Sequence, residues 1–230
     1  MISQTLLSPR VLLQITNYRR EWRNPSTHDH LLNFDEDEAL LAIVNVAVFA
    51  IVLADQIIGK IGFKEGLEIS KLQAKSNDIF DSLAERTIIL PKHFTNRFNM
   101  ANKDRTDVRE AEVVGALSGF LSSSMRDVTC IPEARLAKSS IVDLLLVSEK
   151  EKLIIEVKYN RLFSNIGQNR VTSCVSQVSK YMELGEISTA IVYIYSNNKR
   201  KNEEEIVVRE KSPLGVEGRV IIVATQAVIP

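Results

Sequence analysis

The pattern of hydrophobic and polar positions divides the chain into two parts of different periodicity. Before about residue 104, apolar residues recur at helical spacing, as in Gly66–Thr87, or form the continuous run Ala39–Leu53 behind the acidic residues Asp35–Glu38. Negative charge ahead of an apolar run suits the start of a helix. A polar, basic stretch with few apolar periodicities, Pro91–Arg109, is expected to connect two domains. The N-terminal region, residues 1–104, is therefore predicted to be mostly helical.

From about Asp107 the periodicity changes to a mixture of helix and strand. The order is one helix, three strands, a long helix and a strand, followed by an extra strand. The segments are Glu110–Leu121, Val128–Leu136, Ile141–Val147, Leu153–Tyr159, Asn165–Glu183, Ser188–Tyr195 and Arg219–Thr225. Because two of the strands form a hairpin and the long helix allows a crossover, we expect an α/β domain with a mixed sheet over residues 105–230.

The apolar run Ala39–Leu53 has three interpretations. It is shorter than the ~20 apolar residues that usually span a bilayer, and Asp55 follows it closely. We therefore favour a buried core helix or a dimer-interface helix over a membrane anchor. Lys60 and Lys64 come next, so an anchor would leave the C-terminal part in the cytoplasm. The N-terminal region would serve dimerisation or the docking of DNA or a partner.

Composition and charge narrow the class of protein only in part. The chain has 230 residues, enough for one large domain or two small ones, and its 29 basic and 29 acidic residues give no overall preference for nucleic acid or membranes. The two cysteines, Cys130 and Cys174, form no CxxC motif, which favours a cytoplasmic protein without a disulfide framework. His28 and His30 could bind a metal, but a solvated polar turn is the better interpretation of so short a motif.

Three ionisable residues interrupt the predicted hairpin of Ile141–Arg161. Glu156 and Lys158 share one face of its second strand, because side chains alternate along a strand. The turn falls within Ser148–Glu151, and any loop of even length about that centre places Asp143 directly opposite Glu156. The Cβ atoms of the two acids would then lie roughly 4.5–5.5 Å apart. A loop of odd length would place the two acids on opposite faces.

Two carboxylates directly opposite each other destabilise a sheet unless a cation, a shared proton or solvent compensates. Lys158 supplies one positive charge, and a divalent ion would supply the rest. Mg²⁺ takes oxygen ligands, commonly one or two carboxylates with water and substrate phosphate, and Asp143 and Glu156 fit that role. The competing interpretation is an exposed hairpin face with a simple Glu–Lys pair. Apolar residues on both faces of these strands favour a central position in the sheet, where an idle charge is costly.

The residues Val142-Asp143 and Glu156-Val157-Lys158 resemble the motif of the PD-(D/E)XK nuclease superfamily, with valine in place of the family's proline. In the next helix, QVSKY (Gln177–Tyr181) resembles the QxxxY motif of the RecB-like and lambda-exonuclease-like branch. Gln177 and Tyr181 are four residues apart and so lie on one helical face. The resemblance covers about Asp107–Thr225. It implies a restriction-endonuclease-like αβββαβ core with a central mixed sheet.

The resemblance also implies how a metal would be held and used. Asp143, Glu156 and the Val157 carbonyl would bind Mg²⁺, for which Mn²⁺ can substitute. Lys158 would orient or help deprotonate the attacking water and stabilise charge on the phosphate. Gln177 and Tyr181 would contact and position the substrate.

An acid from the first helix of the core would complete the site. Glu110 is favoured because it lines up with the inward apolar stripe of that helix, and Glu112 is held in reserve. Glu133 is a weaker candidate, equally well explained as an exposed strand residue beside Arg135. Basic residues that could hold phosphates, or could be ordinary solvated charges, are Arg161, Arg170, Arg97, Lys103, Arg105 and Arg109.

The leading hypothesis is a Mg²⁺-dependent deoxyribonuclease acting on DNA, double-stranded DNA being favoured, as an endonuclease of restriction, defence or repair. One alternative is a catalytically inactive subunit that keeps the nuclease fold for DNA binding or assembly, with a possible homodimer through the N-terminal region. Another is a membrane-anchored nuclease that uses Ala39–Leu53 as a short span. Two cysteines are too few for the four-cysteine iron–sulfur cluster of some RecB-like enzymes, so no cluster is expected.

Overall fold

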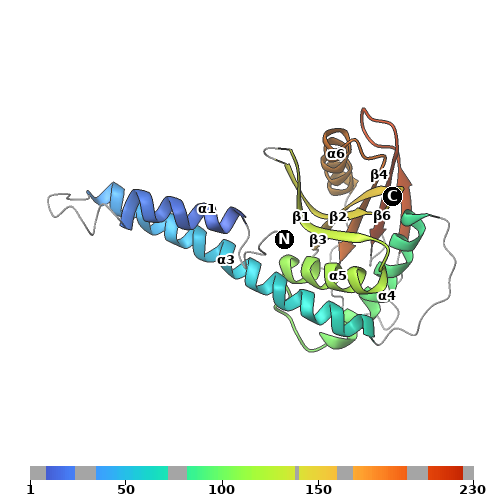
Figure 1. Ribbon diagram of the computed structural model, residues 1–230, viewed down its shortest axis with the longest axis horizontal. Coiled ribbons are helices and arrows are strands. Elements are labelled where there is room, and N and C mark those ends of the chain that lie inside the picture. Colours follow the sequence, from blue (N-terminus) through green and yellow to red (C-terminus); the bar gives the residue numbers. More distant parts are fainter. Residues whose placement is uncertain are drawn as a thin grey trace. The chain divides into compact units, whose positions relative to one another are not determined.

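The computed structural model describes residues 9–23, 35–71, 82–137, 140–159, 168–195 and 207–224, which belong to two compact units. The boundary between the units falls between Ile58 and Gly59, inside the continuous helix α3 (Glu36–Lys71). Figure 1 shows the helices of the first unit and the sheet of the second. The sequence predicted a domain boundary between residues 104 and 105. The boundary between the two compact units does not test that prediction.

The first unit is helical. It contains α1 (Pro9–Tyr18), the short π-helix η1 (Arg19–Arg23) and the beginning of α3, with α1 running beside α3 (Figure 1). A capping box fixes the start of α3: the Glu38 N–H donates to Asp35 Oδ1 over 2.8 Å, and the Asp35 N–H donates to Glu38 Oε2 over 3.2 Å. The prediction of a mostly helical N-terminal region is confirmed for the residues that the structure describes.

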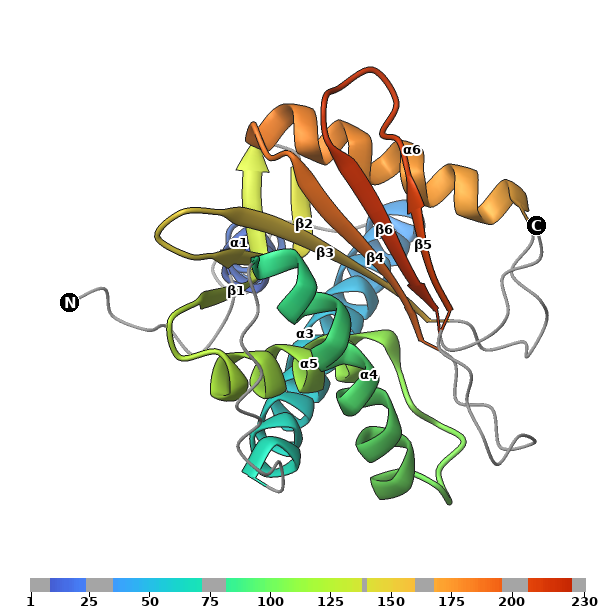
Figure 2. The ribbon, with the colours of Figure 1, turned by 90° about the vertical axis from the view of Figure 1, so that its right-hand side faces the viewer.

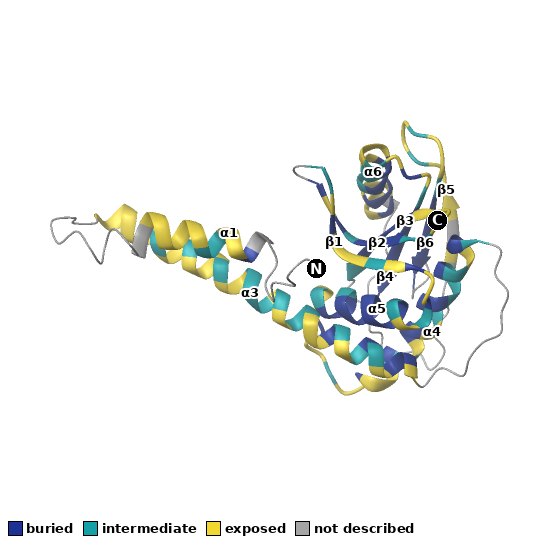
Figure 3. Cartoon of the chain, viewed as in Figure 1, coloured by how far each residue is buried: buried dark blue, intermediate teal, exposed yellow. Residues whose placement is uncertain are grey.

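The apolar run at the start of α3 is not buried in this chain. Leu40, Ile43 and Ile51 keep 60%, 66% and 62% of their surface exposed. Figure 3 shows exposed and half-buried residues all along this part of the helix. The expectation of a buried core helix is therefore wrong. An apolar run predicts that something covers the helix, and nothing in its pattern says whether the cover is this chain's own core, a second molecule or lipid.

The second unit is built on a six-stranded mixed sheet in the order β1-β2-β3-β4-β6-β5. β1, β2 and β3 are antiparallel neighbours, β3, β4 and β6 run parallel, and β5 is antiparallel to β6. The strands are β1 (Thr129–Ala137), β2 (Ser140–Val147), β3 (Lys152–Tyr159), β4 (Thr189–Tyr195), β5 (Val207–Lys211) and β6 (Arg219–Ala224). The predicted α/β class with a mixed sheet is confirmed.

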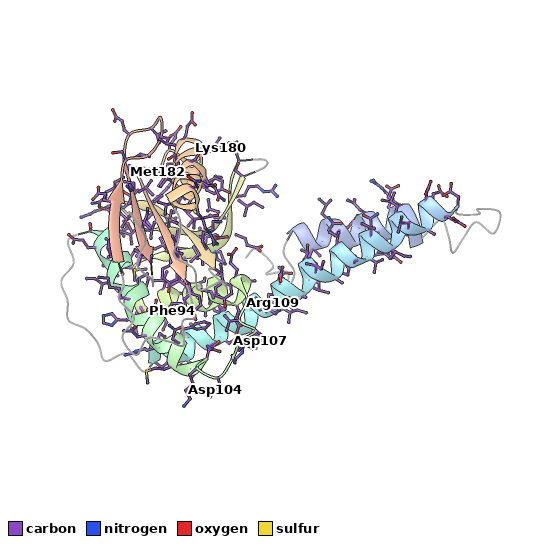
Figure 4. All side chains as sticks on the ribbon, turned by 180° about the vertical axis from the view of Figure 1, so that it is seen from behind. Phe94, Asp104, Asp107, Arg109, Lys180 and Met182 are labelled. Atoms are coloured by element: carbon purple, nitrogen blue, oxygen red, sulfur yellow. The ribbon has the colours of Figure 1, made fainter. Side chains whose placement is uncertain are left out.

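Helices cover both faces of this sheet (Figure 2). On one face lies α6 (Gln168–Gly185), with Met182 buried against the sheet and Lys180 exposed (Figure 4). On the other lie α4 (Leu83–Ala101) and α5 (Glu110–Ser124), whose apolar side chains join Ile155 and Val157 of β3 in one core. Because both faces are covered, the central strands are apolar on both sides, and an ionisable side chain on β3 is held in the interior.

Most of the stretch expected to connect two domains is helix, so that expectation is wrong. α4 continues to Ala101, and Leu90, Phe94 (Figure 4) and Phe98 on one of its faces are buried in the core. Pro91 lies inside the helix, and the polar residues around it obscured the four-residue spacing of its apolar face in the sequence.

The expected continuous helix Gly66–Thr87 is also wrong. α3 ends at Lys71, and α4 begins only at Leu83. Ser82 marks that start, since its backbone is extended and its side chain accepts the Glu85 N–H over 3.2 Å, as an N-cap does. The sequence contains the signal for this start, a serine three residues ahead of a glutamate, and the apolar residues on either side of it obscure the break.

Direct backbone contact joins the C-terminal part of α3 to α5. Gly62 and Gly66 of α3 face α5, and Gly115 and Gly119 of α5 face α3. A Cβ atom added to Gly115 would stand 1.9 Å from the carbonyl oxygen of Gly59, which is far inside van der Waals contact. Glycine is therefore required at this crossing, because no side chain fits between the two helices. The contact fixes α5, and with it the start of α5, against the rest of the second unit.

Strand β5 is the one described strand that the sequence pattern does not predict. It begins with two valines and ends in Arg209-Glu210-Lys211, and it pairs only with β6 at the edge of the sheet. Charged residues are typical of an edge strand, because they oppose pairing with other chains. The same residues remove the apolar alternation by which a strand is detected.

Candidate functional site

The β2–β3 hairpin has the register that the sequence predicts. Its loop is Ser148–Glu151, and the antiparallel ladder extends to the pair formed by Leu144 and Ile155. Asp143 and Glu156 are the next residues beyond that pair, so the two acids lie at the position where the ladder ends. The prediction of an even loop is confirmed, whereas Asp143 and Glu156 do not form a pair of the ladder.

Glu156 is the most buried of the ionisable residues predicted for the site, with 3% of its surface exposed. Its Oε1 accepts two hydrogen bonds, one from Lys158 Nζ and one from Gln177 Nε2, each over 2.7 Å. Its Oε2 is also buried, and no group among the described residues donates a hydrogen bond to it. A buried carboxylate oxygen without a donor is costly, so this atom is positioned to bind a cation.

Asp143 approaches the same place from β2. Its Oδ2 accepts the Val157 N–H over 2.7 Å. Burial, and next the negative charge of Glu156, raise the pKa of Asp143 to about 7, although the Val157 N–H and the Lys158 ammonium oppose that shift. Once Asp143 ionises above about pH 7, two adjacent carboxylates share one ammonium, so the acid pair lacks compensating positive charge.

Lys158 lies with Glu156 on the face of β3 that α6 covers. Burial disfavours its ammonium, but the hydrogen bond to Glu156 and the negative charges of Glu156, Asp143 and Glu110 outweigh burial and raise the pKa of Lys158. The side chain is a protonated donor at neutral pH. In this state it can orient a water molecule or stabilise a developing negative charge, and it cannot accept a proton.

The two candidate acids of α5 are placed differently. Glu110, at the first residue of the helix, accepts the Tyr159 N–H over 2.8 Å and so reaches the end of β3 just past Lys158. Glu112 is buried on the other side of the helix and forms a two-pronged ion pair with Arg105, with Arg105 Nη2 lying 3.1 Å from Glu112 Oε2. Glu110 is therefore the helix acid that the structure brings to the site.

Gln177 and Tyr181 lie together on the face of α6 that meets Glu156. Gln177 Nε2 donates both to Glu156 Oε1 and to the Tyr181 hydroxyl, the latter over 2.9 Å. The glutamine thus fixes the rotamer of Glu156 and directs its unbonded oxygen. Gln177 contacts the acid and Tyr181 contacts Gln177, and the expected contact of both residues with substrate stays a prediction.

The predicted basic residues are only partly near the site. Arg170 donates to the Tyr159 carbonyl over 3.2 Å, at the end of β3, and Arg161 lies outside the described residues. Arg97 donates to the Ile69 carbonyl over 3.1 Å, a contact between helices. Of the other predicted basic residues, Arg105 is engaged by Glu112 and Asp107, and Lys103 and Arg109 are exposed near the start of α5, where Asp107 and Arg109 are marked in Figure 4.

Two residues beside the site had no role in the sequence prediction. Tyr159 connects it on both sides, because its N–H binds Glu110, its carbonyl binds Arg170 and its ring stacks on Tyr195 with centroids 5.7 Å apart. Its place directly after Lys158 was the available signal. Cys174 is buried on α6, and burial raises the pKa of its thiol, so it lies beside the charged groups as a neutral thiol.

Glu133, the weaker candidate acid of the sequence analysis, is exposed, with a φ of 48° that places its backbone in the left-handed region.

The residues fit a hard divalent cation that keeps water or substrate as further ligands. Within the part of the chain that the structure describes, no three His, Cys, Asp or Glu side chains come together as a complete cage. The oxygens available to such a cation are Glu156 Oε2, the Asp143 carboxylate and the Val157 carbonyl. The Val157 carbonyl lies on the side of β3 that faces β2, beyond the last pair of the ladder. Oxygen ligands that are few in number suit Mg²⁺, which retains waters and substrate phosphate.

Replacing Asp143 with asparagine is expected to stabilise the metal-free protein at alkaline pH. The folded pKa of about 7 exceeds the ordinary 3.8, so the stability that the protonated acid contributes is full below about pH 4 and is lost as pH rises through 7. One pKa unit corresponds to about 1.4 kcal/mol, so the gain at pH 8 is at most about 4 kcal/mol. Urea unfolding in a chelator at pH 5 and pH 8 measures it.

The matched control is Asp104→Asn, at an exposed acid of the same unit (Figure 4). It is expected to leave the difference between pH 5 and pH 8 unchanged. If the Asp143→Asn protein is no more stable than the wild type at pH 8, its surroundings do not destabilise the ionised carboxylate of Asp143. The two acids would then need no cation to compensate their charge.

Comparisons with known proteins add no identification. No protein-family model matches the chain. No curated protein matches it either. Among solved structures, a protein of unknown function from Silicibacter pomeroyi is similar over 46% of this chain and 66% of that chain, with 14% sequence identity and a TM-score of 0.23. A likeness at this score carries no inference about fold or function, and the candidate site stands on its own geometry.

Proposed function

We propose that the protein is a Mg²⁺-dependent nuclease that hydrolyses phosphodiester bonds in DNA at the site formed by Asp143, Glu156 and Lys158. The observation that carries the proposal is Glu156 Oε2, a buried carboxylate oxygen that lacks a donor among the described residues and lies beside the half-buried acid Asp143. The order α5-β1-β2-β3-α6-β4 supports a restriction-endonuclease-like core of the PD-(D/E)XK type. Double-stranded DNA and an endonuclease of restriction, defence or repair are part of this proposal.

The metal would be held by Glu156, Asp143 and the Val157 carbonyl, with Mn²⁺ as a substitute. When bound, it would polarise the phosphate and lower the pKa of a water ligand. The chain's own contribution is the placement of these oxygens on two adjacent, buried strands. Gln177 keeps Glu156 oriented by occupying Oε1, so that Oε2 stays available.

Lys158 would place its ammonium beside the attacked phosphate. Its raised pKa keeps it charged, so it would orient the attacking water and stabilise the negative charge that develops on the phosphate oxygens. Proton removal from the water would then fall to another group. Glu110, an exposed residue at the start of α5, is the carboxylate with access to solvent and contact with the end of β3.

Replacing Gln177 with alanine is expected to lower the cleavage rate by roughly 10- to 100-fold, the usual effect of removing a group that orients a metal ligand. Without its amide, Glu156 loses one of the two donors that fix Oε1. Tyr181→Phe, which removes only the hydroxyl that Gln177 contacts, is expected to have a smaller effect. The measurement is single-turnover cleavage over a series of Mg²⁺ concentrations.

Ser176→Ala is the control, because Ser176 is the exposed neighbour of Gln177 on α6. An orienting role predicts that Gln177→Ala raises the Mg²⁺ concentration needed for half-maximal rate, while the unfolding midpoint stays near that of the control. If the Gln177→Ala protein needs the same Mg²⁺ concentration for half-maximal rate as the wild type, Gln177 does not orient a metal ligand.

The direct test of the function is a panel of DNA substrates incubated with the purified full chain. Circular, linear, single-stranded and branched DNA are each treated with Mg²⁺, Mn²⁺ or EDTA. Cleavage of circular DNA with either metal, and none in EDTA, is the expected result and identifies an endonuclease. Binding of DNA without cleavage under every metal condition would contradict the proposal and favour the alternative of an inactive subunit.

A further inference from the structure

The exposed apolar half of α3 is the largest feature of the chain that the proposed nuclease does not use. The stretch Ala39–Ile58 belongs to the first unit, and α3 contains an 18-residue window in which no residue is buried. We infer that this half of α3 inserts into a lipid bilayer and holds the protein at a membrane. This inference is independent of the nuclease activity.

The exposed apolar residues surround more than half of the helix. At about 100° per residue, the exposed aliphatic positions cover roughly 220° of its circumference. They are Leu40, Leu41, Ile43, Val44, Val46, Val48, Ile51 and Ile57. A protein partner, including a second copy of this chain, needs only an apolar stripe of roughly 100° on a helix. An arc twice as wide matches a surrounding apolar solvent better than one packed neighbour.

The two amides of the stretch lie on the remaining side, whereas Asp55 is exposed within the apolar arc near its C-terminal end. Asn45 and Gln56 fall in the narrow arc left by the aliphatic residues, and both are half-buried. Asn45 lines a pocket with polar residues of α1 and η1, namely Gln14, Asn17, Tyr18, Arg20 and Glu21. α1 runs beside α3 within the same unit (Figure 1), and the pocket brings its polar residues next to Asn45, on the side of α3 away from the exposed aliphatic residues.

Length and charge agree with a bilayer. The 18-residue window is about 27 Å long at 1.5 Å per residue, close to the ~30 Å of a hydrocarbon core. Glu36, Asp37 and Glu38 precede the stretch Ala39–Ile58 and Lys60 follows it, so both ends are charged where headgroups would lie. Asp55 lies about one turn from the second end, within reach of the interface.

The test uses the full chain and vesicles of phosphatidylcholine and phosphatidylglycerol. The expected result is that the protein floats with the vesicles and stays with them through an alkaline carbonate wash. Ile43→Lys or Ile51→Lys is expected to lower the retained fraction about a hundredfold, as one lysine in a hydrocarbon core does. Both side chains are exposed, so neither lysine disturbs a packed core, and the unfolding midpoint checks this for each variant.

Met100→Lys is the matched control, because Met100 is an apolar helix residue of the second unit that is 75% exposed. Its retention is expected to equal that of the wild type. Three results would overturn the inference: recovery of the wild type in the soluble fraction without detergent, a defined dimer that shields α3 and does not float, or flotation that neither lysine in α3 reduces.

Discussion

The Glu156→Gln protein is expected to cleave DNA at least about 1,000-fold more slowly than the wild type while keeping its fold. Glutamine has nearly the same shape and can still accept hydrogen bonds from Lys158 and Gln177 at Oε1. It replaces Oε2, the oxygen that lacks a donor, by an amide nitrogen, which cannot bind a metal. Loss of a metal ligand removes most of the transition-state stabilisation that the ion supplies.

The control for this prediction is Glu149→Gln, an identical change at an exposed residue in the turn of the same hairpin. It is expected to cleave at the wild-type rate. Single-turnover cleavage of plasmid DNA in Mg²⁺ measures all three proteins, and thermal unfolding shows whether each is folded. A folded Glu156→Gln protein that keeps more than about a tenth of the wild-type rate would show that this carboxylate is not a metal ligand.

Replacing Gly115 with alanine is expected to destabilise the second unit by about 3 kcal/mol or more, through overpacking against a rigid backbone. The added Cβ atom would lie 1.9 Å from the Gly59 carbonyl oxygen, so the two helices must separate. The sign is diagnostic, because in the middle of an ordinary helix the change from glycine to alanine stabilises by up to about 1 kcal/mol. Chemical unfolding of the full chain measures the difference.

Gly59→Ala is the matched control in the same crossing. Its Cβ atom would stand 3.3 Å from the Ala111 carbonyl oxygen, a separation that a small shift accommodates. It is expected to change stability by less than about 1 kcal/mol. Equal stability of the Gly115→Ala and Gly59→Ala proteins would show that α3 and α5 do not approach each other as closely as the structure has them.

The geometry of the candidate site could be predicted from the sequence because it depends on two fixed features, the alternation of side chains along a strand and the even length of the hairpin loop. Side chains alternate along a strand, and an even loop pairs residues in a fixed register, so Asp143 and Glu156 had to meet if the hairpin formed. The four-residue spacing of Gln177 and Tyr181 placed both on one face of a helix in the same way. The target of Gln177 did not follow, because which face of α6 meets β3 depends on the packing of the whole sheet.

Other parts of the fold could not be predicted for identifiable reasons. The N-terminal half of α3 and the core face of α4 contain similar apolar residues, yet the first is exposed and the second is buried, since pattern alone does not say what covers a helix. Glycine has low helix propensity, so Gly115 and Gly119 weaken the helical pattern in the sequence. Their role, the close approach of α3 to α5, is seen only in the packed structure. The preference for Glu110 over Glu112 rested on a helical stripe, and the structure shows that the other stripe faces α3 and Arg105.

The most direct test of the central claim is to locate the metal in crystals of the full chain grown with Mn²⁺ and a short DNA duplex. Anomalous scattering identifies Mn²⁺ without reference to the chemistry it performs. The account predicts a peak at ligand distance, about 2.1–2.3 Å, from Glu156 Oε2, with Asp143 and the Val157 carbonyl as neighbours and a DNA phosphate beside Lys158. A peak bound elsewhere, or DNA bound with no metal between these two acids, would contradict it.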